Sequence, residues 1–199
     1  MSILSFFRKK RTLPAPDPFV HCMILSRREE PPGEDTLRNA LRAAFGPEAN
    51  CRRHDDGWWM LMVRGAERAA VAFIPGPVPN GDAEKAAEMP LWSDGPAEAK
   101  HCSHAVVSCK ASQGGPVESA LLLTAIVRAM LDAFDATAVY WRASAVTVSR
   151  LRFDHVAAFA TREQLPLELW CRFEPFRVDN EHGGLHTIGL RQFGPMTSL

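Results

Sequence analysis

The sequence has no excess of charge of either sign, because 23 Lys and Arg residues balance 23 Asp and Glu residues among its 199 positions. Such a chain has no overall field to attract nucleic acid or anionic lipid, so we expect no nucleic-acid binding. No apolar run approaches the ~18 residues that a membrane-spanning helix needs. The opening MSILSFF is too short for the apolar part of a signal peptide, and basic residues follow it instead of preceding it. We therefore expect a cytoplasmic protein.

Paired cysteine motifs are also missing. The five cysteines are scattered and mostly lie within apolar stretches: Cys22, Cys51, Cys102, Cys109 and Cys171. An odd, scattered set is typical of reduced, buried thiols in a cytosolic protein and not of a disulfide framework. We therefore expect free thiols.

Motifs that carry chemistry are absent as well. The chain has no G-x-S-x-G nucleophile turn and no glycine-rich phosphate loop. Its densest group of metal-ligand types is His101, Cys102 and His104, but on a strand His101 would point to the opposite face from the other two. Cys51 and His54 form a second pair, and a structural zinc site needs four ligands. We predict no catalytic, cofactor-binding or metal-binding residues.

Two further features leave alternatives open. Gly114, Gly115 and Pro116 open a predicted helix whose first amides could bind an anion, although an ordinary helix start is the favoured interpretation. Large aromatic side chains could mark a recognition surface or could close the rims of the core. These aromatic residues are Trp58, Trp59, Trp92, Tyr140 and Trp141.

The chain divides into a tail and a folded domain. Residues 1–16 are predicted to be a flexible basic tail, with four positive charges at positions 8–11 and a proline-rich end. Residues 17–199 are predicted to form a single α+β domain. Without the four charges of the tail, 19 basic residues remain against 23 acidic ones, so the predicted domain is mildly acidic.

The hydrophobic pattern of residues 17–199 predicts more strands than helices. Strands are expected at Phe19–Ser26, in a hairpin at Cys51–Gly65, and at Ala69–Ile74, His101–Ala111, Ala138–Ala143, Leu167–Phe173 and Gly184–Leu190. Helices are expected within Pro31–Gly46 and at Pro116–Phe134 and Leu151–Ala160, with a short polar helix and a loop between Asn80 and Ala99.

This order indicates a mostly antiparallel sheet packed on a long central apolar helix, Pro116–Phe134. Only Glu118, Arg128 and Asp132 are charged in that helix, so we expect other layers to enclose it. The similarity of FVHCMILSR to CSHAVVSCK, each ahead of a helix, suggests two ferredoxin-like halves that share one sheet.

Six segments follow one another along the predicted domain: VAFIPGPVP, HAVVSCKAS, PVESALLLTAIVRAML, AVYWRAS, LPLELWCRFEPFR and GGLHTIGLRQFG. Together they resemble a bacterial family of uncharacterised proteins, the domain of unknown function forty-two sixty-one. The resemblance covers nearly everything from Phe19 onward and departs at Asn80 and Gly81, where the family carries a Trp-type continuation. It implies a single intracellular bacterial domain. The family has no established activity, so the resemblance implies no role for any residue.

The leading hypothesis is a non-catalytic cytoplasmic interaction protein whose partner is another protein. An immunity or accessory protein for a bacterial toxin or secretion system fits, because an acidic surface speeds encounter with a basic toxin. The alternative is an enzyme or small-ligand binder whose site combines distant residues such as Cys102, His104 and His155. A third hypothesis is recruitment to a membrane surface through the tail, with Leu4, Phe6 and Phe7 buried.

Overall fold

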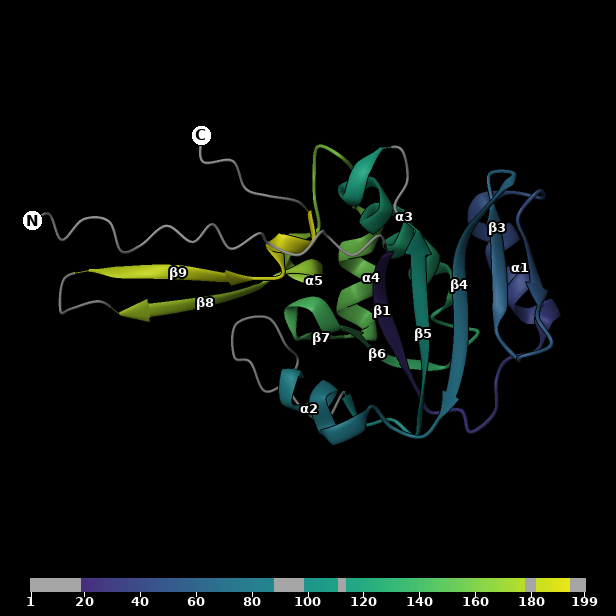
Figure 1. Ribbon diagram of the computed structural model, residues 1–199, viewed down its shortest axis with the longest axis horizontal. Helices are drawn as coiled ribbons and strands as arrows, with labels where there is room; N and C mark the ends of the chain where they lie inside the picture. Colours follow the sequence, from purple (N-terminus) through teal and green to yellow (C-terminus); the bar gives the residue numbers. More distant parts are fainter. Residues whose placement is uncertain (1–18, 88–98, 111–113, 178–181, 194–199) are drawn as a thin grey trace, which may run out of the picture.

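The protein has an α+β architecture with a large antiparallel sheet and several helices (Figure 1). The computed structural model describes residues 19–87, 99–110, 114–177 and 182–193. The strands are β1 (Phe19–Ser26), β2 (Asn50–Arg53), β3 (Trp59–Val63), β4 (Ala66–Pro75), β5 (Ser103–Lys110), β6 (Ala136–Trp141), β7 (Val146–Ser149), β8 (Arg172–Arg177) and β9 (Gly183–Ile188). The helices are α1 (Glu34–Phe45), α2 (Asp82–Ala87), α3 (Gly115–Met130), α4 (Arg150–Ala158) and α5 (Leu167–Trp170).

Seven strands form one sheet in the order β2-β3-β4-β5-β1-β6-β7, and every neighbouring pair is antiparallel. Strand β1 therefore lies between β5 and β6, which α3 connects. The connection through α1 is different, because three strands separate β1 from β2. Two ferredoxin-like halves would need equivalent crossovers, so that expectation is not confirmed.

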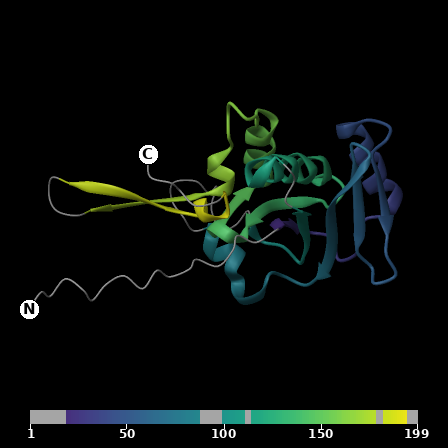
Figure 2. The same ribbon diagram turned by 45° about the horizontal axis from the view of Figure 1, so that its top comes forward.

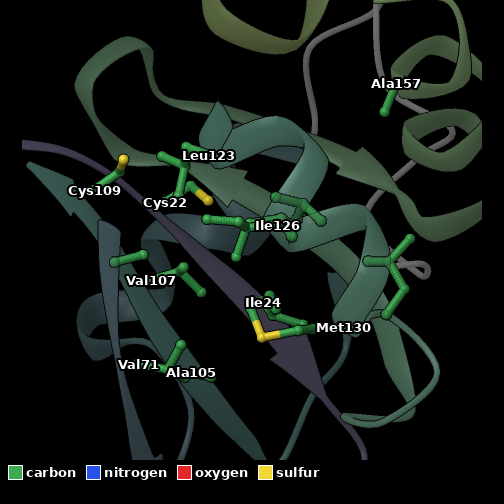
Figure 3. Packing of buried hydrophobic residues seen from close by; sticks show 14 of the residues in the cluster. Cys22, Ile24, Val71, Ala105, Val107, Cys109, Leu123, Ile126, Met130 and Ala157 are labelled. Atoms are coloured by element: carbon green, nitrogen blue, oxygen red, sulfur yellow. The ribbon is translucent and has the colours of Figure 1, made fainter. Parts of the chain in front are cut away.

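The two faces of the sheet are covered unequally. Residues at alternate positions of the strands, including Cys22, Ile24, Val71 and Val107, join buried side chains of α1, α3 and α4 in the main core (Figure 3). Helix α3 contributes Leu123 and other fully buried side chains to this core. On the opposite face, α2 covers a smaller cluster that contains Met23, Leu25, Ala138 and Tyr140.

Helix α3 differs from the predicted central helix in length and environment. It ends at Met130, and a turn that includes the buried Phe134 leads into β6. Its apolar residues are not all enclosed, because Leu121 and Leu122 are only partly buried. The interpretation of an all-round buried helix is therefore not confirmed. The low charge of the helix reflects one face against the sheet and flanks against α1 and α4.

Strands β8 and β9 form a separate two-stranded ribbon that projects from the rest of the protein (Figures 1 and 2). We call this ribbon the arm, and the seven-stranded sheet with α1–α5 the body. Gly189 lies where β9 returns to the body. It has a φ of +100°, and a Cβ built there would lie 2.6 Å from Ser144 Cβ and 2.8 Å from the carbonyl oxygen of Trp170. Only glycine fits this junction without strain.

Three expectations about individual elements need correction or fall outside the described residues. The strand predicted at Leu167–Phe173 is wrong in its first half, because Leu167–Trp170 form one helical turn after Pro166 and β8 begins at Arg172. Strand β7 was not predicted, since four residues are too few for a clear alternation. The predicted tail, residues 1–16, and the loop around Trp92 lie outside the described residues.

Candidate protein-binding groove

An apolar groove of about 530 Å³ lies where the arm meets the body. It opens between the end of α4, the following turn and α5 on one side, and the base of the arm on the other. The residues that line it are Val156, Phe159, Gln164, Leu165, Pro166, Leu167, Glu168, Phe173, Pro175 and Leu185. We call this feature the groove.

The groove exposes large apolar side chains to solvent. Phe159 is 56% exposed, Leu167 is 38% exposed and Leu185 is 58% exposed. Phe176, further out on the arm, is 51% exposed. Scattered apolar residues are ordinary on a protein surface, but a contiguous exposed set around a hollow marks a binding surface. The three of these residues that line the groove come from the end of α4, from α5 and from β9, which makes the hollow a product of the fold.

The wall formed by α4 and α5 is held in place by polar contacts. Helix α4 starts at Ser149, whose hydroxyl accepts a hydrogen bond from the backbone N–H of Arg152. The Arg152 guanidinium also pairs with the Glu168 carboxylate at 2.6 Å, which ties α4 to α5. Phe153 and Ala157 face the core, so the last turn of α4 leaves Phe159 toward solvent. The groove is therefore preformed on this side.

Buried polar contacts also anchor α5 from behind. The Trp170 indole N–H donates to the Thr124 hydroxyl of α3 at 2.9 Å, and the side-chain amide of Gln192 donates to the Trp170 carbonyl at 3.0 Å. The Trp141 indole N–H donates to Gln192 Oε1 at 3.0 Å. The indoles of Trp141 and Trp170 thus both have a partner, which removes the desolvation cost of an unpaired donor. The chain after the arm is tied to the same structure that supports the groove.

The histidines of the HCSH segment lie on the same, α2 side of the sheet, with ring centroids 6.4 Å apart. The prediction that His101 points to the opposite face is wrong, because His101 precedes β5 and is not part of the strand. The buried His101 ring accepts the Val78 N–H at Nε2 over 2.8 Å, so its proton lies on Nδ1, which faces the Ala99 carbonyl at 2.7 Å and Glu84 Oε1 at 3.2 Å. His104 Nδ1 lies 3.0 Å from the Gly76 carbonyl. Burial lowers the pKa of His104, and the nearby His101 adds to this effect. Both rings therefore hold the loop after β4 in place through hydrogen bonds to its backbone.

Cys102 is the exposed cysteine of the five. Its thiol faces the carbonyl oxygens of Ser26, Arg27 and Arg28 at 3.6, 3.0 and 3.4 Å, so it packs against the turn after β1.

The hypothesised site of Cys102, His104 and His155 does not assemble. His104 points to the α2 face of the sheet, whereas α4, which carries the exposed His155, packs on the opposite face. Within the described ranges, no three His, Cys, Asp or Glu side chains are grouped so that they could hold a metal ion. Likewise, none of the described helices is both long enough and apolar enough to cross a membrane.

The other ligand pair is also occupied by structural contacts. Cys51 is buried and its thiol donates to the Glu34 carbonyl at 3.4 Å, while burial raises its pKa to about 11. His54 stacks on Trp58, with ring centroids 3.8 Å apart. Burial likewise raises the pKa of Cys109 and of Cys171 to about 11, as expected for thiols that serve as packing.

The aromatic residues considered for recognition belong mostly to the core. Trp59, Tyr140 and Trp141 are at most 4% exposed, and Trp58 is partly buried against His54. The interpretation that they close the core therefore holds for these four residues. Gly114 and Gly115 begin α3 without a side-chain cap, and the proline in its first turn is typical of an ordinary helix start.

Comparisons with models of protein families, with curated proteins and with solved structures found no match. The resemblance to the domain of unknown function forty-two sixty-one stays a prediction.

The residues of the groove were not singled out by the sequence. Phe159 and Leu185 are separated by 25 positions and by two elements, so no local spacing links them. The one available signal was the proline in Gln164-Leu165-Pro166-Leu167, which places apolar residues in a turn. Loops that carry apolar residues are candidates for binding.

Proposed function

We propose that this chain is a non-catalytic, cytoplasmic bacterial protein that binds another protein through the groove. The observation that carries the proposal is the set of exposed apolar side chains, Phe159, Leu167 and Leu185, around a preformed hollow. In this view it is an immunity or accessory protein for a toxin or secretion system.

The groove suits an apolar anchor of a partner. Interfaces typically owe most of their affinity to a few large side chains that fill pockets. An anchor that removes about 100 Å² of apolar surface from water contributes roughly 2.5 kcal/mol. Because α4 and α5 are already tied by Arg152 and Glu168, little ordering of this wall would oppose binding.

An ion pair at the border of the groove would set orientation more than affinity. Glu168, which lines the groove, pairs with Arg152. Such a pair contributes little to stability, but it places opposite charges next to an apolar centre. A partner with a complementary charged rim would be steered into one register.

A second candidate is a binder of an apolar small molecule, which the volume of the groove favours. Ligand pockets usually measure about 300–1,000 Å³ and are mostly apolar with a few polar groups. The groove, at about 530 Å³ with Glu168 and Gln164 at its border, falls in this range. This is the form of the ligand-binder alternative that the structure leaves open.

The experiment compares Phe159→Gln with Leu151→Gln as matched variants. Both residues belong to α4 or its end and are strongly exposed, but Leu151 does not line the groove. A tagged wild-type protein and the Leu151→Gln variant should capture the same stoichiometric protein from a native bacterial lysate. Phe159→Gln should lose it while its circular dichroism and melting temperature stay unchanged.

Equal capture of the protein by Phe159→Gln and Leu151→Gln, or capture of no stoichiometric protein, would contradict the proposal. Binding of the apolar dye anilinonaphthalene sulfonate separates the two candidates. A dye that binds tightly to the wild-type protein and weakly to Phe159→Gln, in the absence of any protein partner, would favour the small-molecule candidate.

A further inference from the structure

The arm has two long edges, and only one of them is blocked. Proline lacks an N–H, so it lies within a β-ladder only where its nitrogen faces away from the paired strand. Pro175 lies opposite Leu185 in the register of β8 and β9. The outer edge of β8 therefore lacks a donor at its middle.

The same register opens the outer edge of β9. Directly opposite residues of an antiparallel pair turn their backbone groups either both toward each other or both away. Since Pro175 faces away, Leu185 directs its N–H and C=O outward, and Gly183 and Thr187 do so two positions to either side. Among the described residues, no third strand pairs with the arm.

The other strand edges carry protection that β9 lacks. At one edge of the large sheet, β2 presents the exposed Arg52 and Arg53. At the other edge, all four side chains of β7 are buried beneath neighbouring elements. Strand β8 carries Pro175 together with charged residues at three positions. Charges, proline and coverage are the means by which proteins keep edge strands from pairing.

Strand β9, with the sequence GGLHTI, has no Lys, Arg, Asp or Glu. Its most exposed large apolar side chain is Leu185. An isolated two-stranded ribbon is marginally stable in water, and further strands stabilise it. Among the described residues the outer edge of β9 is therefore unpaired, and a further strand on that edge would stabilise the arm.

We infer that β9 pairs antiparallel with β9 of a second copy of this chain, which joins two arms into a four-stranded sheet. The outward backbone groups are symmetric about Leu185, so a two-fold axis there sets Leu185 against its counterpart and Gly183 against Thr187 of the second copy. Each outward N–H then meets an outward C=O.

Side chains and shape are compatible with this pairing. The axis places His186 opposite Gly184 of the second copy, so no like charges lie directly across from each other. Because the pairing is antiparallel and the arm projects from the body, the two bodies lie at opposite ends of the four-stranded sheet (Figures 1 and 2). A foreign strand would find the same edge but not the symmetry, which is why we choose a second copy.

Leu185 serves both proposals, but the dimer uses its outward backbone groups and the groove uses its side chain. The dimer is tested by mass and the proposed function by capture of a partner, so the two can fail separately. Sedimentation of the full chain from about 5 to 200 µM should show a monomer–dimer equilibrium, since one strand pair is smaller than the ~1,200–2,000 Å² of a standard interface. Leu185→Pro removes an outward N–H without removing a bond inside the arm, and it should weaken dimerisation at least tenfold. Leu151→Gln should leave it unchanged.

A disulfide trap tests the register without relying on Leu185→Pro. Directly opposite hydrogen-bonded residues have Cα atoms about 5.5 Å apart, within the range for a disulfide. In a Cys102→Ser background, Leu185→Cys should give a covalent dimer on oxidation. Thr187→Cys should not, because the two copies of position 187 lie about 13 Å apart along the strands.

Three results would each overturn the inference. They are a monomer across the whole concentration range, a dimer that Leu185→Pro does not weaken, and equal cross-linking at positions 185 and 187. Foreign-protein pairing on β9 is the outcome in which a captured partner, and no second copy, is cross-linked through Leu185→Cys.

Discussion

The body and the arm are built from the same kind of strand but are stabilised in opposite ways. In the body, strand β1 is paired on both sides and covered by buried side chains on both faces. In the arm, β8 and β9 pair only with each other, and their side chains are half-buried or exposed. The two regions therefore differ in side-chain burial and in the number of hydrogen-bonded neighbours of each strand.

This difference separates stability from recognition. Hydrophobic burial supplies most of the stabilisation of a domain, and the body contains nearly all of it. The arm and the neighbouring groove contain most of the large apolar side chains that remain exposed. Changes in the body should therefore unfold the protein, whereas changes in the arm should alter what it binds.

The largest effect is expected from Leu123→Ala in the core of the body. Leu123 is fully buried, so truncation removes transfer free energy and leaves a cavity, which costs about 2–5 kcal/mol. Each kcal/mol lowers the melting temperature by roughly 2–4 °C in a protein of this size. The matched control is Leu122→Ala, one position away and only partly buried. Calorimetry that ranked Leu122→Ala as the more damaging change would show that the packed face of α3 is assigned wrongly.

A smaller loss is expected from Gly189→Ala, at the junction of arm and body. Both Gly189 and Gly65 have positive φ, so alanine strains the backbone at either position by about 1–3 kcal/mol. Only at Gly189 does the new Cβ also collide, with Ser144 and with the Trp170 carbonyl. Urea unfolding should show a greater loss for Gly189→Ala than for Gly65→Ala. Equal losses would mean that arm and body do not approach each other closely.

The next effect depends on pH and concerns His104, which is buried in the body. Because burial lowers its pKa in the folded state, the unfolded chain binds a proton first as the pH falls below about 6.5. The contribution of His104 to stability is therefore complete above that pH and is lost as the solution becomes more acidic. The drop in urea midpoint between pH 7.5 and 5.5 should be smaller in His104→Gln. An unchanged drop in the variant would assign the pH dependence to other groups.

The smallest effect on global stability is expected from Phe176→Ala in the arm. Phe176 is 51% exposed and its ring covers Gly184, so the body should lose no more than about 0.5 kcal/mol. Hydrogen exchange should nevertheless become faster in β9, since the ring shields the ladder there. A fall in melting temperature as large as that of Leu123→Ala would remove the distinction between body and arm.

The elements of the body were largely predictable because periodicity and turn residues agree there. Phe19–Ser26 is a continuous apolar run, and β1 has those bounds. The hairpin of β2 and β3 forms around the predicted Asp56-Gly57 turn. The order of strands was not predictable, because nothing local in β1 says that it lies between β5 and β6. Only tertiary packing decides that insertion.

The groove was harder to predict for a different reason. Leu167–Trp170 is apolar and reads as a strand, but Pro166 and the anchoring of Trp170 to Thr124 turn it into a helix. Adjacent aromatic residues such as Tyr140 and Trp141 invite an interpretation as a surface, yet both faces of β6 are covered. A surface assembled from distant segments cannot be predicted from the spacing of residues along the sequence. It follows only once the fold is known.

The position of β1 between β5 and β6 has a consequence for biosynthesis. Ribosomes add roughly 5–20 residues per second, so the end of β6 at Trp141 is made on the order of 10 s after Ser26. During that interval the apolar strand β1 first lacks both of its neighbours, and once Lys110 has been added it still lacks β6. The large sheet can therefore close only after most of the chain has been translated. Strand β1, the earliest described strand to be synthesised, must wait for partners that are encoded far downstream.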